Sequence, residues 1–230
     1  MSIFSKSIPN NTLCLHHPSA AYALKVMFLP EALKVFKEMP QWNVVCFNAV
    51  LSGISQNGLP GEALKVHCLA VKLAVEFDVY VATSLVTVYS NCGDVSASEV
   101  FKEMPLKSVV SYNVFVSGLL QNGIPRLVLD VFKDMIMVGF LEVKPNSVTL
   151  VSARFACATL LYACFGRQVH GLALKFASYD EVILVTALVD MYSKCGCRHA
   201  AFNVFNAAEG NNRNLITWNS MISGMMLNAV

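Results

Sequence analysis

The chain repeats itself along its length, and this feature constrains its fold more than any other. The run EALKV at residues 31–35 recurs at 62–66, and VFKEMP at 35–40 recurs at 100–105. Matching positions of successive copies lie 35, 30, 38, 35 and 33 residues apart, which gives a mean period of about 34. A repeat of this length is typical of a helical hairpin that buries its apolar face only against neighbouring hairpins.

The spacing of apolar residues inside one copy predicts two helices. In residues 112–120 they recur at the three- and four-residue steps of a helical stripe, and a second stripe covers 127–135. Asn122-Gly123 predicts a break between the two helices, and Pro125 suits the first turn of the second, where its missing N–H costs nothing. We therefore predict an all-α protein, a right-handed α-solenoid of two-helix repeats of about 35 residues.

The composition limits the class of protein further. Hydrophobic residues make up 55% of the chain and charged residues 14%, so the chain must bury much apolar surface, and disorder is disfavoured except at the ends. The longest uncharged stretch near the middle, residues 108–125, contains turn signals, so no membrane span is expected. The net charge of +2 is too small to indicate a nucleic-acid partner by itself.

Eight cysteines are scattered along the chain without any CxxC pair. Cys195 and Cys197, with His199 nearby, form the one cluster, whereas structural zinc sites usually combine two such clusters. We therefore expect no metal site and no cofactor, and we interpret the thiols as free in a reducing compartment. Cys92 and Cys195 are instead expected to close helices, because a glycine follows each of them.

Residues 1–30 contain no Asp or Glu but several Ser, Lys and His residues, which is the bias of an organellar transit peptide. A disordered leader fits nearly as well, and an eroded repeat is a third alternative. The expected localisation is the mitochondrion, with the chloroplast as the alternative. The remaining residues divide into a partial unit 31–43, five units 44–78, 79–108, 109–146, 147–181 and 182–214, and a partial unit 215–230.

A period near 34 leaves two main families of helical hairpin, the tetratricopeptide type and the pentatricopeptide type. The phrases VVSYN at 109–113, GRQVHG at 166–171, ALVDMYSKCG at 187–196 and ITWNSMISG at 216–224 closely resemble plant pentatricopeptide repeats. The resemblance covers roughly residues 31–230, and the unequal unit lengths are similar to the subclass that alternates P, L and S repeats. It implies sequence-specific binding of single-stranded organellar RNA, one base per repeat, in RNA processing or editing.

The resemblance also implies which residues contact the RNA. In each unit a residue of the first helix and the last residue of the unit select the base together, and a residue three places before the first selector sandwiches the base. The first selectors are Asn48, Thr83, Asn113, Val151, Thr186 and Asn219. The second selectors are Asp78, Ser108, Asn146, Glu181 and Asn214. The sandwiching residues are Val45, Tyr80, Val110, Val148, Ile183 and Ile216.

The residue types suit base selection. An amide offers donors and an acceptor, and a hydroxyl offers one donor and two lone pairs, so short polar groups held on a helix can distinguish base edges. The family's rule implies that Asn48 with Asp78 prefers uracil, Asn113 with Asn146 cytosine, Thr186 with Asn214 adenine, and Thr83 with Ser108 weakly a purine. Val151 with Glu181 gives no clear preference. The alternative is that an Asn or Thr at these places is a helix cap or a plain surface residue.

We predict that the chain is not an enzyme. Longer members of the resembled subclass end in a cytidine-deaminase-like domain, whose chemistry needs an H-x-E acid/base and paired cysteines. Neither H-x-E nor P-C-x-x-C occurs here, and we interpret His67 and His170 as packing residues. The resemblance thus implies a truncated member, with a deaminase or editing factor supplied in trans. The alternatives are a protein-binding helical scaffold and an inactive truncated gene product.

One departure from the pattern indicates a missing repeat. The first helix expected around Asn48 resembles the one around Asn113, but the second helix, with His67, resembles the one with His170. The distance from Asn113 to His170 is 38 residues longer than the distance from Asn48 to His67, and 38 residues is close to one unit. Our hypothesis is that one whole repeat is missing between them. An intact extra unit in the gene or transcript would show that the loss arose in sequence assembly or splicing, and its absence would place the loss in the protein itself.

Overall fold

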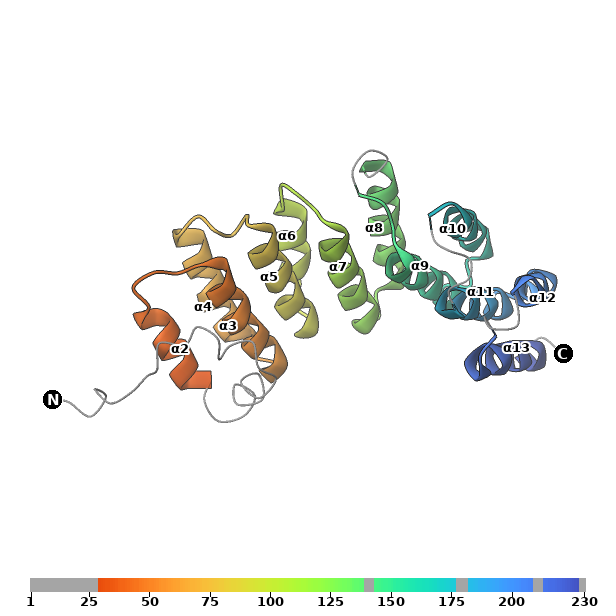
Figure 1. Cartoon of the computed structure of the whole chain (residues 1–230), viewed down its shortest axis with the longest axis horizontal. Helices are drawn as coiled ribbons and strands as arrows, with labels where there is room; N and C mark the ends of the chain where they lie inside the picture. Colours follow the sequence, from red (N-terminus) through yellow and green to blue (C-terminus); the bar gives the residue numbers. More distant parts are fainter. Residues whose placement is uncertain (1–28, 139–142, 177–181, 209–212, 228–230) are drawn as a thin grey trace.

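The computed structural model describes residues 29–138, 143–176, 182–208 and 213–227. Within these ranges the chain forms twelve helices and no strand. The helices alternate along the chain between two rows, so that each unit is a two-helix hairpin packed on the next (Figure 1). The prediction of an all-α helical-repeat solenoid is therefore confirmed.

The first row contains the helix that opens each unit, and successive members of this row contact one another. Each of these helices begins at the first residue of a predicted unit. The six helices are α3 (Val44–Asn57), α5 (Val79–Asn91), α7 (Val109–Gln121), α9 (Ser147–Thr159), α11 (Val182–Lys194) and α13 (Leu215–Leu227).

The second row contains the helix that closes each unit. Its members are α2 (Leu29–Glu38), α4 (Pro60–Lys72), α6 (Ser96–Glu103), α8 (Pro125–Val138), α10 (Ala163–Phe176) and α12 (Arg198–Ala207). Helix α6 is the shortest, with 8 residues, and it belongs to the shortest unit. Helices α3 and α4 pack together as one hairpin, although their sequences resemble different units.

The first-row helices begin where a short polar side chain binds the backbone of the first turn. Such a side chain satisfies one of the N–H groups that have no partner inside the helix. The last residue of one unit is thus the N-cap of the next unit's first helix. The structure describes this cap at Asn43, Asp78, Ser108 and Asn146.

The turn between the two helices of a unit needs one residue in the left-handed region of backbone conformation. Glycine fills this place in four units, at Gly58, Gly93, Gly123 and Gly196, with φ between 62° and 72°. Glycine adopts such a φ without steric cost because it has no Cβ. In the unit 147–181 the same place is held by Leu161, with a φ of 53°.

Two contacts between units recur 103 residues apart. The imidazole Nδ1 of His67 lies 3.1 Å from the hydroxyl of Tyr89, and Nδ1 of His170 lies 2.9 Å from the hydroxyl of Tyr192. In each case a second-row helix is joined to the first-row helix of the next unit. Burial lowers the pKa of both histidines, so the neutral form is favoured, as suits a packing residue.

The stack changes direction between α8 and α9, where the helix axes turn in the view of Figure 1. Of the two helices in the preceding unit, α9 packs more closely against the second-row helix α8 than against α7. The other first-row helices from α5 onward pack more closely against the preceding first-row helix. The bend therefore lies between the third and fourth complete units. None of the described helices is long and apolar enough to cross a membrane. The leader expected over residues 1–30 lies, but for its last two residues, outside the described residues.

Candidate nucleic-acid interface

A row of apolar side chains faces solvent along the first-row helices. The side chains lie in the first turn of these helices, and their exposed fractions run from 51% for Val148 to 70% for Tyr80. A single exposed apolar residue is ordinary, but the same place is exposed and apolar in all six helices. We call this set the apolar row: Val45, Tyr80, Val110, Val148, Ile183 and Ile216, the six residues expected to sandwich bases.

The first selectors lie one turn further along the same helices. Their environments differ, although Asn48, Thr83, Asn113 and Thr186 are all partly buried. Asn48 Oδ1 accepts a hydrogen bond of 2.9 Å from Ser84 Oγ of the next unit. Thr83 Oγ1 donates to the backbone carbonyl of Val79 in its own helix. Of the other two first selectors, Val151 packs against the core and Asn219 is exposed.

Asn113 is held in a network that joins two units. Its Nδ2 donates to Asn146 Oδ1 at 3.2 Å, and its Oδ1 accepts from Thr149 Oγ1 at 2.6 Å. Asn146 Oδ1 also accepts from the backbone N–H of Thr149 at 3.1 Å, as the cap of α9. Both selectors of this unit therefore meet, and a third residue, Thr149, binds them together.

The same arrangement recurs further along the stack. The hydroxyls of Thr186 and Thr217 lie 2.6 Å apart, and Thr217 Oγ1 donates to Asn214 Oδ1 at 3.0 Å. Asn214 Oδ1 also accepts from the backbone N–H of Thr217 at 2.9 Å. The selectors Thr186 and Asn214 are thus joined through the hydroxyl of Thr217.

The remaining second selectors serve as caps. Asp78 accepts from the backbone N–H groups of Tyr80 and Val81, and Ser108 forms a reciprocal capping box with Ser111. Capping and base selection are compatible in an Asn, because the cap uses the amide oxygen and leaves the amide nitrogen. Glu181 lies outside the described residues.

The residues that join the selectors were not expected from the sequence. Thr149, Thr217 and Ser84 were not among the expected contacts, yet each bonds a first selector of the preceding unit. A signal existed, because the third residue of a unit is polar in the phrases VVSYN and ITWN. It could not be interpreted without knowing which atoms meet across the interface between units.

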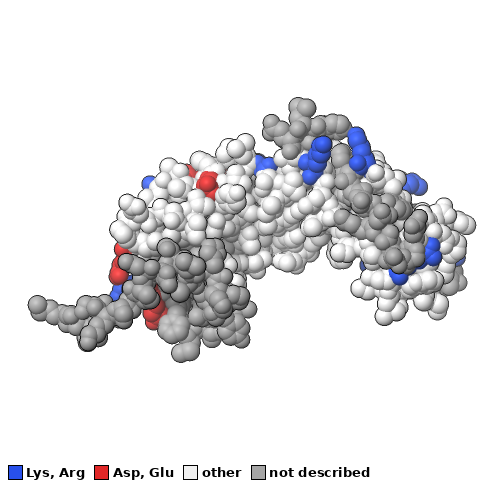
Figure 2. All heavy atoms as spheres, in the orientation of Figure 1, with Lys and Arg blue, Asp and Glu red and all other residues white. Residues whose placement is uncertain are grey.

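The acidic and basic residues are distributed unevenly along the stack. In the face shown in Figure 2, the visible Asp and Glu lie on the half with α2 to α6, and most Lys and Arg lie on the half with α8 to α12. Among the described selectors only Asp78 carries a charge. The selecting atoms are therefore neutral donors and acceptors, and attraction of phosphate depends on the basic half.

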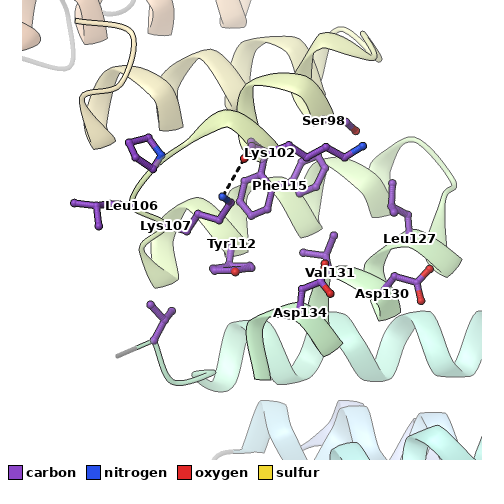
Figure 3. A pocket seen from close by; sticks show the side chains of 13 residues that line it. Ser98, Lys102, Leu106, Lys107, Tyr112, Phe115, Leu127, Asp130, Val131 and Asp134 are labelled. Atoms are coloured by element: carbon purple, nitrogen blue, oxygen red, sulfur yellow. Dashed lines mark hydrogen bonds between the residues drawn. The ribbon is translucent and has the colours of Figure 1, made fainter. Parts of the chain in front are cut away.

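A cavity of about 420 Å³ lies between α6 and α8, apart from the apolar row. Figure 3 shows Tyr112 and Phe115 on its floor, with Lys102 on one wall and Asp130 and Asp134 on the other. Its lining contains no selector and no member of the apolar row. It is a second candidate surface, of mainly apolar character.

The matches with known proteins fall on the repeat units described above. A family model described as PPR repeat matches residues 45–73 and 110–140. The chain is 42% identical to the pentatricopeptide repeat-containing protein At2g02750 of Arabidopsis thaliana over 89% of its own length and 38% of that protein. It is 32% identical to the chloroplastic protein At4g18520 of the same plant, over 98% of its own length and 36% of that protein. The chain thus spans a little over a third of the length of these relatives.

A further relative and two solved structures are also pentatricopeptide repeat proteins. The mitochondrial pentatricopeptide repeat-containing protein OGR1 of Oryza sativa subsp. japonica is 31% identical over 90% of this chain and 35% of its own length. The crystal structure of PPR10 from maize has a TM-score of 0.66 at 15% sequence identity. The match covers 88% of this chain and 30% of the PPR10 chain. The structure of PPR10 in complex with an 18-nt psaJ RNA element has a TM-score of 0.65 at 20% sequence identity. The match covers 89% of this chain and 31% of the PPR10 chain.

The comparisons bear on two further predictions. These relatives are named as pentatricopeptide repeat-containing proteins, and none of the names gives a catalytic activity. The alignment with At2g02750 runs over 238 positions although it takes up only 89% of the 230 residues here. That relative is therefore longer by about 33 residues over the matched stretch, and the missing repeat stays a hypothesis.

Proposed function

The chain belongs to the pentatricopeptide repeat family, and on that premise we propose that it binds single-stranded RNA along the first-row helices, one base to a unit. The apolar row is the observation that carries the proposal. A solenoid of this kind buries its apolar residues against neighbouring units. Packing therefore does not explain why the same position is apolar and exposed in six helices. Bases lying flat against these side chains would cover them, and any base offers such a face.

The polar residues behind the apolar row supply selection. Asn113 with Asn146 and Thr186 with Asn214 present amide and hydroxyl groups one helical turn further along the helices. We propose preferences for uracil at Asn48, cytosine at Asn113 and adenine at Thr186, with a weak purine preference at Thr83. Val151 offers no polar atom, so its unit leaves a gap in the recognised sequence.

The expected affinity is modest. Four selecting units at about 1–3 kcal/mol each give roughly 4–12 kcal/mol before the RNA and the side chains are ordered. The phosphate contribution is small for a chain of net charge +2. We therefore expect micromolar or weaker binding by this chain alone.

The relatives that carry an organelle in their names are called chloroplastic or mitochondrial. We propose that the RNA is an organellar transcript and that the chain acts in its processing or editing, with the mitochondrion as the first expectation. A deaminase or editing factor would then be supplied by another protein. Crosslinking in isolated organelles, followed by sequencing of the bound RNA, identifies the compartment and the transcript together.

The test of RNA binding is a pair of substitutions in the apolar row, Val110→Ser with Ile183→Ser. Their side chains are 62% and 69% exposed, so the fold should be kept while RNA binding falls at least tenfold, at about 1 kcal/mol per base. The matched control is Val95→Ser with Leu174→Ser, which are 79% and 59% exposed and lie outside the row. Binding is measured by filter retention of labelled RNA at fixed salt.

Two outcomes would contradict the proposal. One is an equal loss in the control pair, which would make the effect one of general surface character. The other is nanomolar binding of any RNA whatever its sequence, which the small number of selecting units and the low net charge cannot supply.

The cavity between α6 and α8 favours a second candidate function, a scaffold that binds a protein partner. Its mainly apolar lining, with Lys102 facing Asp130 and Asp134, suits a short amphipathic segment better than a nucleotide. Substitution of Asn113 and Thr186 separates the two functions. RNA binding falls in these variants if the first proposal is right, whereas binding of a partner in the cavity does not change.

A further inference from the structure

Two buried threonines each lie against a first selector of the preceding unit. They are Thr149 and Thr217, each the third residue of its unit, and both are almost fully buried, with exposed fractions of 1% and 0%. Each hydroxyl lies 2.6 Å from a first selector in the preceding unit. A buried hydroxyl at this distance has to take part in a hydrogen bond, because an unbonded one would be costly.

At Asn113 the backbone sets the orientation of the whole network. Asn146 Oδ1 accepts from the backbone N–H of Thr149, so this atom is fixed as an acceptor by the start of α9. The Asn113 atom 3.2 Å away must then be the donor Nδ2, and the other amide atom, Oδ1, faces the hydroxyl of Thr149. Thr149 donates to that oxygen, because a carboxamide oxygen can only accept.

The result is a pair of selectors that offers mainly donors. Asn113 has one N–H left, and Asn146 has its Nδ2 group, to which no described residue is bonded. Cytosine presents acceptors at N3 and O2, whereas uracil presents a donor at N3. A selector N–H that meets N3 of the base therefore favours cytosine over uracil.

At Thr186 the matching residue is Thr217, whose hydroxyl lies 2.6 Å from Thr186 Oγ1 and 3.0 Å from Asn214 Oδ1. Thr217 has a single hydroxyl proton, and either hydroxyl of the pair can be the donor of the shorter bond. This contact therefore joins the two units without fixing Thr186 as a donor or an acceptor toward a base.

We infer that Thr149 is a specificity-determining positioning residue, which fixes Asn113 as a donor toward the RNA base. The inference rests on the proposed RNA-binding function and adds one residue of the following unit to the selecting pair Asn113 and Asn146. Where that residue has no hydroxyl, the device is absent. Val81 and Leu184 hold the third place in the units after Asn48 and Val151, and Asn48 is bonded to Ser84 instead.

The test is selection from a pool of short RNAs randomised at every position. The native chain is compared with Thr149→Val, which keeps the shape and removes the hydroxyl, and with Thr149→Ser, which keeps the hydroxyl. The preference for cytosine over uracil at one position should fall about tenfold in T149V, the value of one neutral hydrogen bond, and persist in T149S.

Thr159→Val is the matched control, because Thr159 Oγ1 donates only within α9, to the carbonyl of Phe155. It should leave every preference unchanged. If the native chain selects a sequence but T149V selects the same bases with the same ratios, the positioning role is wrong and the proposed function stands. If the native chain selects no sequence, the proposed function fails and this inference with it.

Discussion

The unit 147–181 and the unit that follows it, 182–214, have the same architecture, and three of the matched places at which their residues differ affect selection, the core and the turn. Their first helices, α9 and α11, both have 13 residues and pack against each other. Where the later unit has Thr186, Val189 and Gly196, the earlier one has Val151, Arg154 and Leu161. These are a selector, a core residue and the turn residue. A solenoid tolerates such departures because each unit contacts only its neighbours, so their costs stay local.

The core residue is the most unusual of the three. Arg154 is 0% exposed, and none of the described residues forms a hydrogen bond with its guanidinium nitrogens. Burial lowers its pKa to about 9, which measures how strongly the apolar surroundings oppose the charge. The matched place is apolar and buried in the other complete units, at Leu51, Val86, Val116 and Val189.

Exchanging the core residues gives the largest expected effect. Arg154→Val should raise the free energy of unfolding by about 3 kcal/mol, because it removes an uncompensated buried charge. Val189→Arg should lower it by at least as much, since it places that charge in a well-packed site. Urea unfolding followed by circular dichroism measures both changes.

The control for this exchange is Leu174→Val, which changes the size of an exposed side chain on α10 and should have no measurable effect. A loss of stability in R154V would show that the guanidinium is bonded in solution and that the comparison of the two cores is wrong.

The turn residues give the next largest effect. Leu161 has a φ of 53°, a conformation that costs a residue with a Cβ about 1–2 kcal/mol. After allowance for the greater freedom of glycine in the unfolded chain, Leu161→Gly should stabilise by about 1 kcal/mol, and Gly196→Ala should destabilise by a similar amount. Thermal unfolding should show opposite shifts of about 2–4 °C. Equal melting temperatures for L161G and the native chain would mean that the turn is not strained.

Much of this architecture follows from short-range sequence. The period, the polar cap before each first helix and the glycine after it are local signals, and the helix starts coincide with the unit starts expected from them. The apolar row was also expected, because its place in the repeat fixes its place on the helix. The division into units and the roles of the selectors are supported by position and stay predictions until binding is measured.

The features that sequence alone could not supply are those that depend on how one unit lies on the next. The bond from Thr149 to Asn113 joins residues 36 apart and requires the register of α9 on α7. The bend between α8 and α9 is set by side-chain packing at one junction. Arg154 could be noticed by aligning the units, but its burial, and therefore its cost, is known only from the structure.

The smallest effect concerns the two histidine–tyrosine contacts. Desolvation is the main cause of the lowered pKa of both His67 and His170. At His170 the charge of Arg154 lowers the pKa further, whereas Glu103 and Glu76 act in the opposite direction at His67. Arg154→Val should therefore raise the pKa of His170 and leave that of His67 unchanged, as followed by NMR titration of the ring protons.

The sign of the stability change follows from the same shift. A histidine whose pKa is lower in the folded chain binds fewer protons there than in the unfolded chain, so its contribution to stability is fully present above about pH 6.5 and is lost as the pH falls below that value. R154V brings the folded pKa of His170 closer to the unfolded value. The loss of unfolding free energy between pH 7 and pH 5.5 should thus be smaller in R154V than in the native chain. An equal loss in both would mean that Arg154 and His170 do not interact, and that the two contacts are electrostatically alike.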